Sequence, residues 1–561
     1  MRQPVKYNCR LVAQALVAYG VRHVVVSPGS RNAPLVMAVT RAGALKPVSV
    51  IDERSAAFVA LGLAGVTGAP VAMVCTSGSA MLNYSPALAE AYYRKLPLMA
   101  VTADRPGVWI GQDDSQTIRQ PGALANVVID QCSLPVLGDT VEPSDDSMAL
   151  ARRDAVRTLN RVLTAAVTHR RGPVHINIEI DEPLGLETSI DENIREFQKI
   201  DTVYPDPKIS VATARMLANE LSGRRVVVFG GFHAPDARLS AALNRLAALP
   251  SVVVVAEALA NVHGAGIMQF TDGMMKLSPE RPDVLITFGG APVSRVFKEY
   301  VRRGDLEHWH VGANDAIIDM SLNLTRRIEM HASDFFGRFA GAMCHGVRNG
   351  VRPDSFKQSW QSAAESHRSD VARHNRWPWC GLSAIGDLIG LLPDTANIQL
   401  GNGLSVRHAQ VFDLRRFHRV DSNRGVSGID GCLSTAVGAA LAYKAGPTVA
   451  IVGDMSALYD MGALASVRLC DNLKIVVVNN NGGQIFRTIK ATRDIPEMEE
   501  FLACHVPDYL QSAATGFDIR YMAVTDRGTL QKAAELIDTP GSCIIEIIVG
   551  TGADDYALCG L

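Results

Sequence analysis

A carboxylate and a carboxamide follow two apolar segments in the last third of the chain. Asp454 comes directly after residues 449–453, and Asn480 comes directly after residues 475–479. If these segments are neighbouring parallel strands, the two side chains meet at the carboxyl edge of one sheet. With a backbone carbonyl from the turn at Gly482 they would form an all-oxygen site, which suits Mg²⁺ and leaves positions open for phosphate oxygens. The pattern therefore indicates a metal-bound diphosphate ligand, although the glycine-aspartate pair could also be a plain turn.

A second candidate carboxylate, Glu53, lies near the other end of the chain. It follows the apolar residues 48–50 and precedes an expected helix at residues 55–64. Taken alone, a glutamate in this place is usually a helix cap or a surface charge. Beside a bound ligand, the same group can carry out general acid–base catalysis. Glu53 is therefore a candidate catalytic residue.

The remaining elements are those that must position these side chains. Short runs rich in valine and isoleucine alternate with helical stretches, and many of them end in glycine-containing turns. Strands spaced by helices predict βαβ units and parallel sheets. A polar stretch at residues 187–207 and a charged helical stretch at residues 355–376 separate three blocks. We therefore predict an α/β fold of three doubly wound parallel-sheet domains, at residues 1–185, 204–350 and 376–561.

Composition limits the partners and the compartment. The 561 residues carry a formal net charge of −2, so nothing indicates a nucleic-acid partner. There is no apolar run of about 18 residues that would predict a membrane span, and no signal peptide is recognisable. The ten cysteines are scattered without a C-x-x-C pair, which argues against a zinc knuckle. We expect a reducing, cytoplasmic location.

Four segments make the sequence more specific. They are residues 27–31 (SPGSR), 102–106 (TADRP) with 116–122 (QTIRQPG), 422–431 (SNRGVSGIDG), and 453–460 (GDMSALYD) with 479–486 (NNNGGQIF). The sequence resembles the thiamine-diphosphate-dependent decarboxylases and carboligases, because it has a glutamate in the first block and an aspartate–asparagine pair in the last. Within that superfamily, the arginine-bearing segments resemble the 2-succinyl-5-enolpyruvyl-6-hydroxy-3-cyclohexene-1-carboxylate synthases of menaquinone biosynthesis. The resemblance covers nearly the whole chain.

The resemblance implies a transferase that uses thiamine diphosphate and Mg²⁺, with Mn²⁺ as an alternative metal. The donor would be 2-oxoglutarate, and the succinic-semialdehyde carbanion left by decarboxylation would add in a 1,4 sense to isochorismate. The resemblance also implies a pyrimidine-binding first domain, a central domain and a diphosphate-binding last domain. The expected assembly is a homodimer or a dimer of dimers, in which the glutamate and the metal pair meet across two subunits.

The resemblance also assigns individual residues. Glu53 would share a proton with the aminopyrimidine ring of the cofactor. The residues expected to hold the cofactor are Glu53, Gly401, Asn402, Ile429, Asp454, Met455, Ser456, Asn480, Gln484, Ile485 and Phe486, and the metal ligands are Asp454, Asn480 and Gly482. The residues expected to bind substrate are Ser30, Arg31, Arg105, Ser115, Gln116, Arg295, Arg407, Arg424, Ile485 and Phe486.

Arginines suit these substrates because the guanidinium fork binds a carboxylate bidentately. We assign Arg407 and Arg424 to the donor, and Arg31 and Arg105 to isochorismate. A single arginine is more often a solvated or structural charge, and the apolar residues assigned to the site fit core packing about as well. The central domain lacks a G-x-G-x-x-G segment, so no FAD or NAD site is predicted.

Two positions depart from the usual patterns. Relatives carry a serine where this chain has Gly403, which puts one donor contact in doubt unless Ser405 replaces it. Met455 stands in place of the last glycine of a Gly-Asp-Gly motif, as is common in this family.

Two rival interpretations remain. One is another thiamine-diphosphate carboligase of the acetolactate synthase type, for which four arginines would be surplus. The other is a non-catalytic binding module of the same fold.

Overall fold

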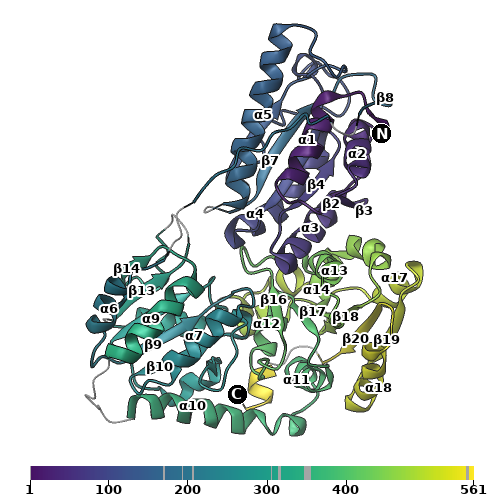
Figure 1. Cartoon of the computed structure of the whole chain (residues 1–561). Helices are drawn as coiled ribbons and strands as arrows, with labels where there is room; N and C mark the ends of the chain where they lie inside the picture. The colour runs from purple at the N-terminus through teal and green to yellow at the C-terminus, as the bar shows by residue number, and fades with distance from the viewer. Residues whose placement is uncertain are drawn as a thin grey trace. The chain divides into compact units, whose positions relative to one another are not determined.

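The computed structural model describes residues 2–168, 171–191, 194–204, 208–304, 306–313, 317–346, 355–550 and 555–560. Three six-stranded sheets and one two-stranded pair form in this part of the chain (Figure 1). In all three large sheets the paired strands run parallel, with helices between them. The predicted fold class is therefore confirmed. Of the predicted domain limits, residues 1, 350 and 561 lie outside the described residues.

The first sheet is built from valine- and alanine-rich strands that are buried over most of their length. Its strand order is β3 (Lys46–Ser49), β2 (His23–Val26), β4 (Val71–Cys75), β5 (Leu98–Asp104), β7 (Val174–Glu179) and β6 (Asp130–Leu134). Its helices are α1 (Tyr7–Ala18), α2 (Ala33–Arg41), α3 (Glu53–Thr67), α4 (Ser85–Arg94) and α5 (Asp146–Val167). The short strands β1 (Arg2–Pro4) and β8 (Glu187–Ser189) pair antiparallel beside it.

The second sheet has the order β11 (Met268–Gln269), β10 (Val252–Ala256), β9 (Val226–Gly230), β12 (Val284–Phe288), β13 (Glu307–Val311) and β14 (Leu324–Ile328). The helices of this region are α6 (Val211–Glu220), α7 (Ala237–Ala247), α8 (Arg295–Arg302), α9 (Ala332–Gly346) and α10 (Ser355–Val371). Its central strands are continuous apolar runs because a parallel sheet is covered on both faces.

The third sheet has the order β16 (Arg419–Ser422), β15 (Asn397–Leu400), β17 (Thr448–Gly453), β18 (Leu473–Asn479), β20 (Cys543–Ile548) and β19 (Arg520–Val524). The longer helices of this region are α11 (Gly381–Leu391), α13 (Cys432–Ala442) and α18 (Arg527–Asp538). Shorter helices are α12 (Leu404–Ala409), α14 (Asp454–Tyr459), α15 (Gln484–Thr488), α16 (Lys490–Arg493), α17 (Leu510–Gly516) and α19 (Asp555–Leu558).

The chain divides into two compact units that interleave in sequence. The first comprises residues 1–203, 425–444 and 459–470, and the second comprises residues 204–424, 445–458 and 471–561. Helix α13 thus belongs to the unit of the first sheet, because it packs closely against α3. A Cβ atom on Gly62 would lie 2.0 Å from the carbonyl oxygen of Thr435, and one on Gly438 would lie 2.0 Å from that of Val59. Only glycine permits this approach of the two backbones.

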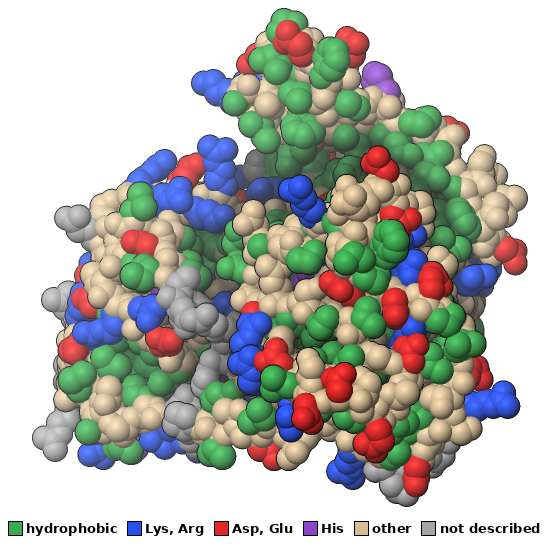
Figure 2. Space-filling model, turned by 90° about the horizontal axis from the view of Figure 1, so that it is seen from above, with side chains coloured by type: hydrophobic (Ala, Val, Ile, Leu, Met, Phe, Trp, Pro, Cys, Tyr) green, Lys and Arg blue, Asp and Glu red, His purple; other side chains and the backbone are tan. Residues whose placement is uncertain are grey.

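Charged side chains of both signs are interspersed over the face shown in Figure 2, in keeping with a net charge near zero. No helix in the described part of the chain combines the length and the apolar character needed to cross a membrane.

Candidate active site

The third sheet places the predicted metal ligands at one point of its carboxyl edge. Strands β17 and β18 are neighbours, with Gly453 opposite Val478 in the register, so Asp454 and Asn480 follow adjacent strand ends. Strand β15 lies beside β17 on the side away from β18. From β15 the chain continues to β16, at the edge of the sheet, whereas from β17 it continues to β18 on the other side, so the strand order changes direction between β15 and β17. Ligands of doubly wound sheets bind at such a change of direction.

Asp454 is buried, with 2% of its surface exposed. Its Oδ2 accepts a hydrogen bond from the backbone N–H of Gly482 at 2.8 Å, and its Oδ1 accepts one from that of Met455 at 2.8 Å. Burial raises the pKa of Asp454, and these backbone donors oppose that rise. The carboxylate therefore sits on the turn after β18, where a bound cation would compensate its charge.

Asn480 supplies an oxygen that suits a ligand role. Its Oδ1 is buried and has no hydrogen-bond partner within the described residues. A buried amide oxygen without a partner is costly, and a metal ion would satisfy it. The turn continues through Gly482, whose φ of +121° and close approach to the Ala503 carbonyl require glycine. Asp454, Asn480 and the Gly482 carbonyl thus fit the oxygen ligands that Mg²⁺ prefers.

The neighbouring residues expected to hold the cofactor lie on short helices beside this turn. Met455 and Ser456 are in the first turn of α14, and Gln484, Ile485 and Phe486 begin α15. Ser456 and Gln484 are buried, whereas Met455, Ile485 and Phe486 are half-buried. Tyr509 was not singled out from the sequence, yet its hydroxyl donates to the Asp454 carbonyl at 3.2 Å. No motif marks this tyrosine.

The turn after β15 joins two predicted residues directly. Asn402 follows Gly401, donates from Nδ2 to the Asn423 carbonyl at 2.7 Å, and accepts from Nη1 of Arg424 at 2.9 Å. The next residue, Gly403, has a φ of +92° at the start of α12. A serine there would be strained, so this backbone accounts for the glycine. Ser405 is buried two positions later.

Arg407 lines a cavity of about 480 Å³ together with side chains from residues 257–296, from the segment around α12, and with His367 and Tyr556. Its Nη1 lies 3.4 Å from the carbonyl oxygen of Val293. Glu257 lines the same cavity and is 2% exposed; its carboxylate accepts from the backbone N–H groups of Val293 at 2.9 Å and Ser294 at 2.8 Å. Burial raises the pKa of Glu257 to about 7, against these two donors and the charge of Arg424. The sequence offered no signal for this buried glutamate.

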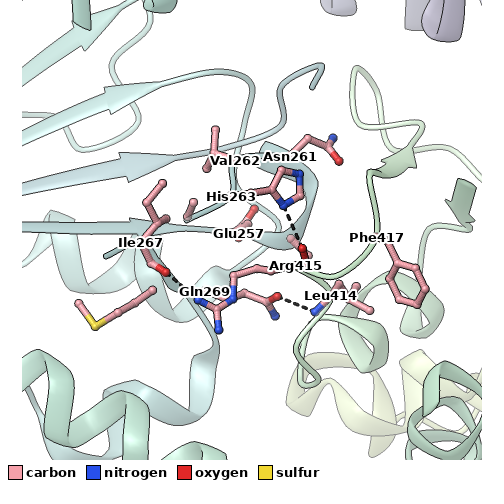
Figure 3. Close-up of a pocket in the computed structure, with 12 residues that line it drawn as sticks. Glu257, Asn261, Val262, His263, Ile267, Gln269, Leu414, Arg415 and Phe417 are labelled. Carbon is pink, nitrogen blue, oxygen red and sulfur yellow. Dashed lines mark hydrogen bonds between the residues drawn. The ribbon is translucent and has the colours of Figure 1, made fainter. Parts of the chain in front are cut away.

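A smaller cavity of about 10 Å³ lies between residues 256–269 and residues 414–417 (Figure 3). His263 Nδ1 lies 3.0 Å from the Arg415 carbonyl, and Gln269 Oε1 accepts from the backbone N–H of Leu414 at 2.9 Å. A space of this size holds one water at most. It is a packed seam between the second and third sheets and not a substrate site.

Arg295 lies apart from the other predicted residues of this unit. Its side chain is 76% exposed and pairs with Glu299 one turn further along α8, with Nε and Oε1 2.9 Å apart. The cavity beside Arg407 is lined by Val293, Ser294 and Val296 but not by Arg295. An acceptor contact by this arginine stays a prediction.

In the first unit, Glu53 opens helix α3. The preceding Asp52 caps the helix by accepting from the backbone N–H of Arg54 at 2.9 Å, so the cap role considered for the glutamate falls to its neighbour. Glu53 itself is half-buried. Ile429 is also half-buried and lies in this unit, on a loop whose Gly425 and Val426 N–H groups donate to the buried carboxylate of Glu90.

Three predicted substrate residues come together after β5. The Nη2 of Arg105 lies 3.3 Å from Ser115 Oγ, and its Nη1 lies 3.3 Å from the carbonyl oxygen of Gln116. Nε of the same guanidinium pairs with Asp114 Oδ2 at 2.6 Å. The side chains of Ser115 and Gln116 are exposed, so this cluster is open to a ligand.

Arg31 follows β2 and is 8% exposed. Its Nη1 donates to the Ile180 carbonyl at 2.9 Å, and its Nη2 pairs with Glu182 Oε1 at 3.1 Å. Part of the Arg31 guanidinium is thus used for structural contacts within the protein, as is usual for a single arginine. Its Nε is buried without a hydrogen-bond partner among the described residues, whereas the adjacent Ser30 is exposed.

Comparisons with known proteins agree with this geometry. Residues 9–123 match the family model "Thiamine pyrophosphate enzyme, N-terminal TPP binding domain", and residues 402–547 match "Thiamine pyrophosphate enzyme, C-terminal TPP binding domain". The chain is 37% identical to a 2-succinyl-5-enolpyruvyl-6-hydroxy-3-cyclohexene-1-carboxylate synthase of Porphyromonas gingivalis, over 91% of this chain and 89% of the relative.

Two further relatives of the same name show similar coverage. The protein from Desulfotalea psychrophila is 36% identical over 91% of this chain and 92% of its own length. The protein from Flavobacterium johnsoniae is 31% identical over 98% of this chain and 97% of its own length. The chain belongs to the 2-succinyl-5-enolpyruvyl-6-hydroxy-3-cyclohexene-1-carboxylate synthase family of thiamine-diphosphate-dependent enzymes.

Proposed function

We propose that this protein decarboxylates 2-oxoglutarate and joins the remaining four-carbon unit to isochorismate, to form the product after which its relatives are named. When bound, thiamine diphosphate would supply the electron sink that the decarboxylation needs. Asp454, Asn480 and the Gly482 carbonyl would hold Mg²⁺ against its diphosphate. Glu53 would exchange a proton with its aminopyrimidine ring.

The observation that carries the metal assignment is the buried Asn480 Oδ1 beside the buried Asp454 carboxylate. Two guanidinium groups of the same unit support a dicarboxylate donor. Arg424 is held by Asn402, and Arg407 lines the 480 Å³ cavity. A carboxylate moved out of water needs a cation or several donors, which these arginines would supply. The exposed cluster of Arg105, Ser115 and Gln116 would bind the acceptor carboxylates.

The decisive experiment offers the purified protein, loaded with thiamine diphosphate and Mg²⁺, 2-oxoglutarate with and without isochorismate. We expect CO₂ release that is faster with isochorismate, together with an adduct of the expected mass. Arg157→Ala serves as the matched arginine control, because this side chain is 74% exposed and pairs with Asp154 on its own helix. Faster CO₂ release from pyruvate would instead favour an acetolactate synthase-type carboligase. Cofactor binding without any CO₂ release would favour a binding module.

We further propose a homodimer, or a dimer of dimers, in the cytoplasm. In such an assembly an inactive Glu53→Gln protein and an inactive Asp454→Ala protein would complement each other. Mixing the two variants under conditions of subunit exchange should restore part of the activity. If the active protein sediments as a monomer in analytical ultracentrifugation, this assembly is contradicted.

A further inference from the structure

Two cysteines that are 179 residues apart in sequence face each other in the second unit. The Sγ atoms of Cys380 and Cys559 lie 3.7 Å apart, and both residues are buried. Cys380 immediately precedes helix α11, and Cys559 follows helix α19 near the C-terminus. The two helices lie side by side (Figure 1). A small approach of the two sulfurs would bring them to bonding distance.

The surroundings of Cys380 favour its thiolate. The contact with the Cys559 thiol, in which either sulfur can be the donor, lowers the pKa of Cys380; burial opposes this, and the backbone N–H of Ser383 at the start of α11 supports it. The pKa of Cys559 is raised in turn by the same contact and by burial. One sulfur is therefore suited to attack an oxidant, and the other remains a thiol that can resolve the product.

A metal site is the alternative use of such a pair. His408 and Asp555 lie nearby, with Nε2 and Oδ2 3.8 Å apart. Asp555 Oδ2 accepts from the backbone N–H of Leu382 at 3.2 Å and so helps to hold α19 against α11. Among the described residues, however, no group of three or more His, Cys, Asp or Glu side chains has a geometry that could hold a metal ion. The cluster therefore favours thiol chemistry.

We propose that Cys380 and Cys559 form an intramolecular disulfide on exposure to a peroxide, which covalently joins the C-terminal helix α19 to α11. The Cys380 thiolate attacks one peroxide oxygen, the O–O bond breaks, and a sulfenic acid forms while hydroxide leaves. The Cys559 sulfur then displaces the sulfenic oxygen as a second hydroxide, which its own proton converts to water. Two thiols lose two protons and two electrons, and hydrogen peroxide becomes two waters.

The disulfide would act on a wall of the large cavity. Tyr556 lies on α19, lines the 480 Å³ cavity as Arg407 does, and packs its ring edge-on against His408 at 5.4 Å between centroids. Joining α19 to α11 would fix the position of this tyrosine. Oxidation of the protein is therefore expected to stabilise the fold and to restrict this wall of the cavity.

The test uses the full-length protein treated with graded hydrogen peroxide after removal of reductant. Thiols are then counted in denaturant, and peptides are mapped by mass spectrometry before and after reduction. We expect the count of ten cysteine thiols to fall by two, and a Cys380–Cys559 linked peptide to appear that dithiothreitol removes. The melting temperature should rise by a few degrees, because the bond closes a long loop.

Three variants make the result specific. Cys380→Ser and Cys559→Ser should each abolish both the linked peptide and the rise in melting temperature. Cys543→Ser removes another buried thiol and should change neither. Because Cys559 lies near the chain end, its variant tests the idea even if Cys380→Ser fails to fold. The proposal is overturned if the wild-type protein keeps all ten thiols, or if the linked peptide joins other cysteines.

Discussion

Nη1 of Arg424 donates a hydrogen bond to Oδ1 of Asn402 at 2.9 Å. Arg424, which we assign to the donor substrate, is thereby held by Asn402, which we assign to the cofactor. Asn402 is itself anchored, because its Nδ2 donates to the Asn423 carbonyl. The two assignments thus share one hydrogen-bonded network, which makes the position of Arg424 dependent on the turn after β15.

The arginines should divide between the two substrates. Arg424→Ala should raise the KM for 2-oxoglutarate by about 10- to 100-fold, because a charge-assisted hydrogen bond contributes about 1.5–3 kcal/mol. Arg31→Ala should raise the KM for isochorismate instead. Arg31 also pairs with Glu182, so Glu182→Gln is the matched control that removes the ion pair and keeps the guanidinium. Steady-state kinetics with each substrate varied would contradict the division if both arginine variants affected the same one.

Asp454→Ala should abolish Mg²⁺-dependent binding of thiamine diphosphate, as measured by calorimetric titration. Asp454→Asn should keep part of it, because an amide oxygen remains beside Asn480. Burial raises the pKa of Asp454, so protons compete with the metal at higher pH than for an exposed aspartate. Metal affinity should therefore fall as the pH is lowered through that raised pKa. Unchanged affinity in Asp454→Ala would rule out the metal assignment.

Glu53→Gln should retain the fold and the cofactor but lose turnover by about 10²–10⁴-fold, the usual contribution of general acid–base catalysis. Asp52→Asn is the neighbouring control, since asparagine also caps a helix well and α3 should remain intact. Hydrogen–deuterium exchange at C2 of the bound cofactor reports the proton transfer directly. Exchange at the wild-type rate in Glu53→Gln would show that another group does this work.

Glu257 should make stability depend on pH. Its folded pKa of about 7 lies above that of an unfolded glutamate. The protein therefore holds a proton that the unfolded chain releases, and its contribution to stability is lost as pH rises from about 4.5 to 7. For one such group the loss is about 1.4 kcal/mol per pH unit in this range. Glu257→Gln lacks this pH-dependent contribution to the free energy of unfolding. The melting temperature of the variant should therefore rise relative to that of the wild type between pH 5 and pH 7. A constant difference would contradict the assignment.

Gly62→Ala should destabilise the first unit strongly, because the new Cβ would lie 2.0 Å from the Thr435 carbonyl and force α3 and α13 apart. We expect about 3 kcal/mol or more, the upper range for overpacking. Gly65→Ala lies one turn further along the same helix, and its Cβ would only approach the end of the Arg94 side chain at 3.4 Å. This control should be neutral or stabilising by about 0.5–1 kcal/mol. Equal melting temperatures of the two variants would refute the close packing.

The sequence alone determined the sheets that carry the site. Apolar runs marked β2, β4, β5, β7, β9, β10, β12, β15, β17, β18 and β20, because central strands of parallel sheets are buried on both faces. The strand ends then located Asp454 and Asn480 at one edge. Strands such as β16 and β19 escaped prediction because they carry polar side chains. In β16, Arg419 and Asp421 are both buried and form an ion pair with each other.

Only the tertiary structure decided which partner each charged side chain has. Arg424 lies against Asn402, and Arg31 lies against Glu182. A charge is stabilised by whatever neighbour the packing of distant segments brings within reach, and no local pattern encodes that neighbour. The same reason kept Glu257 and the facing thiols of Cys380 and Cys559 hidden in the sequence, since each depends on segments that meet only in the folded chain.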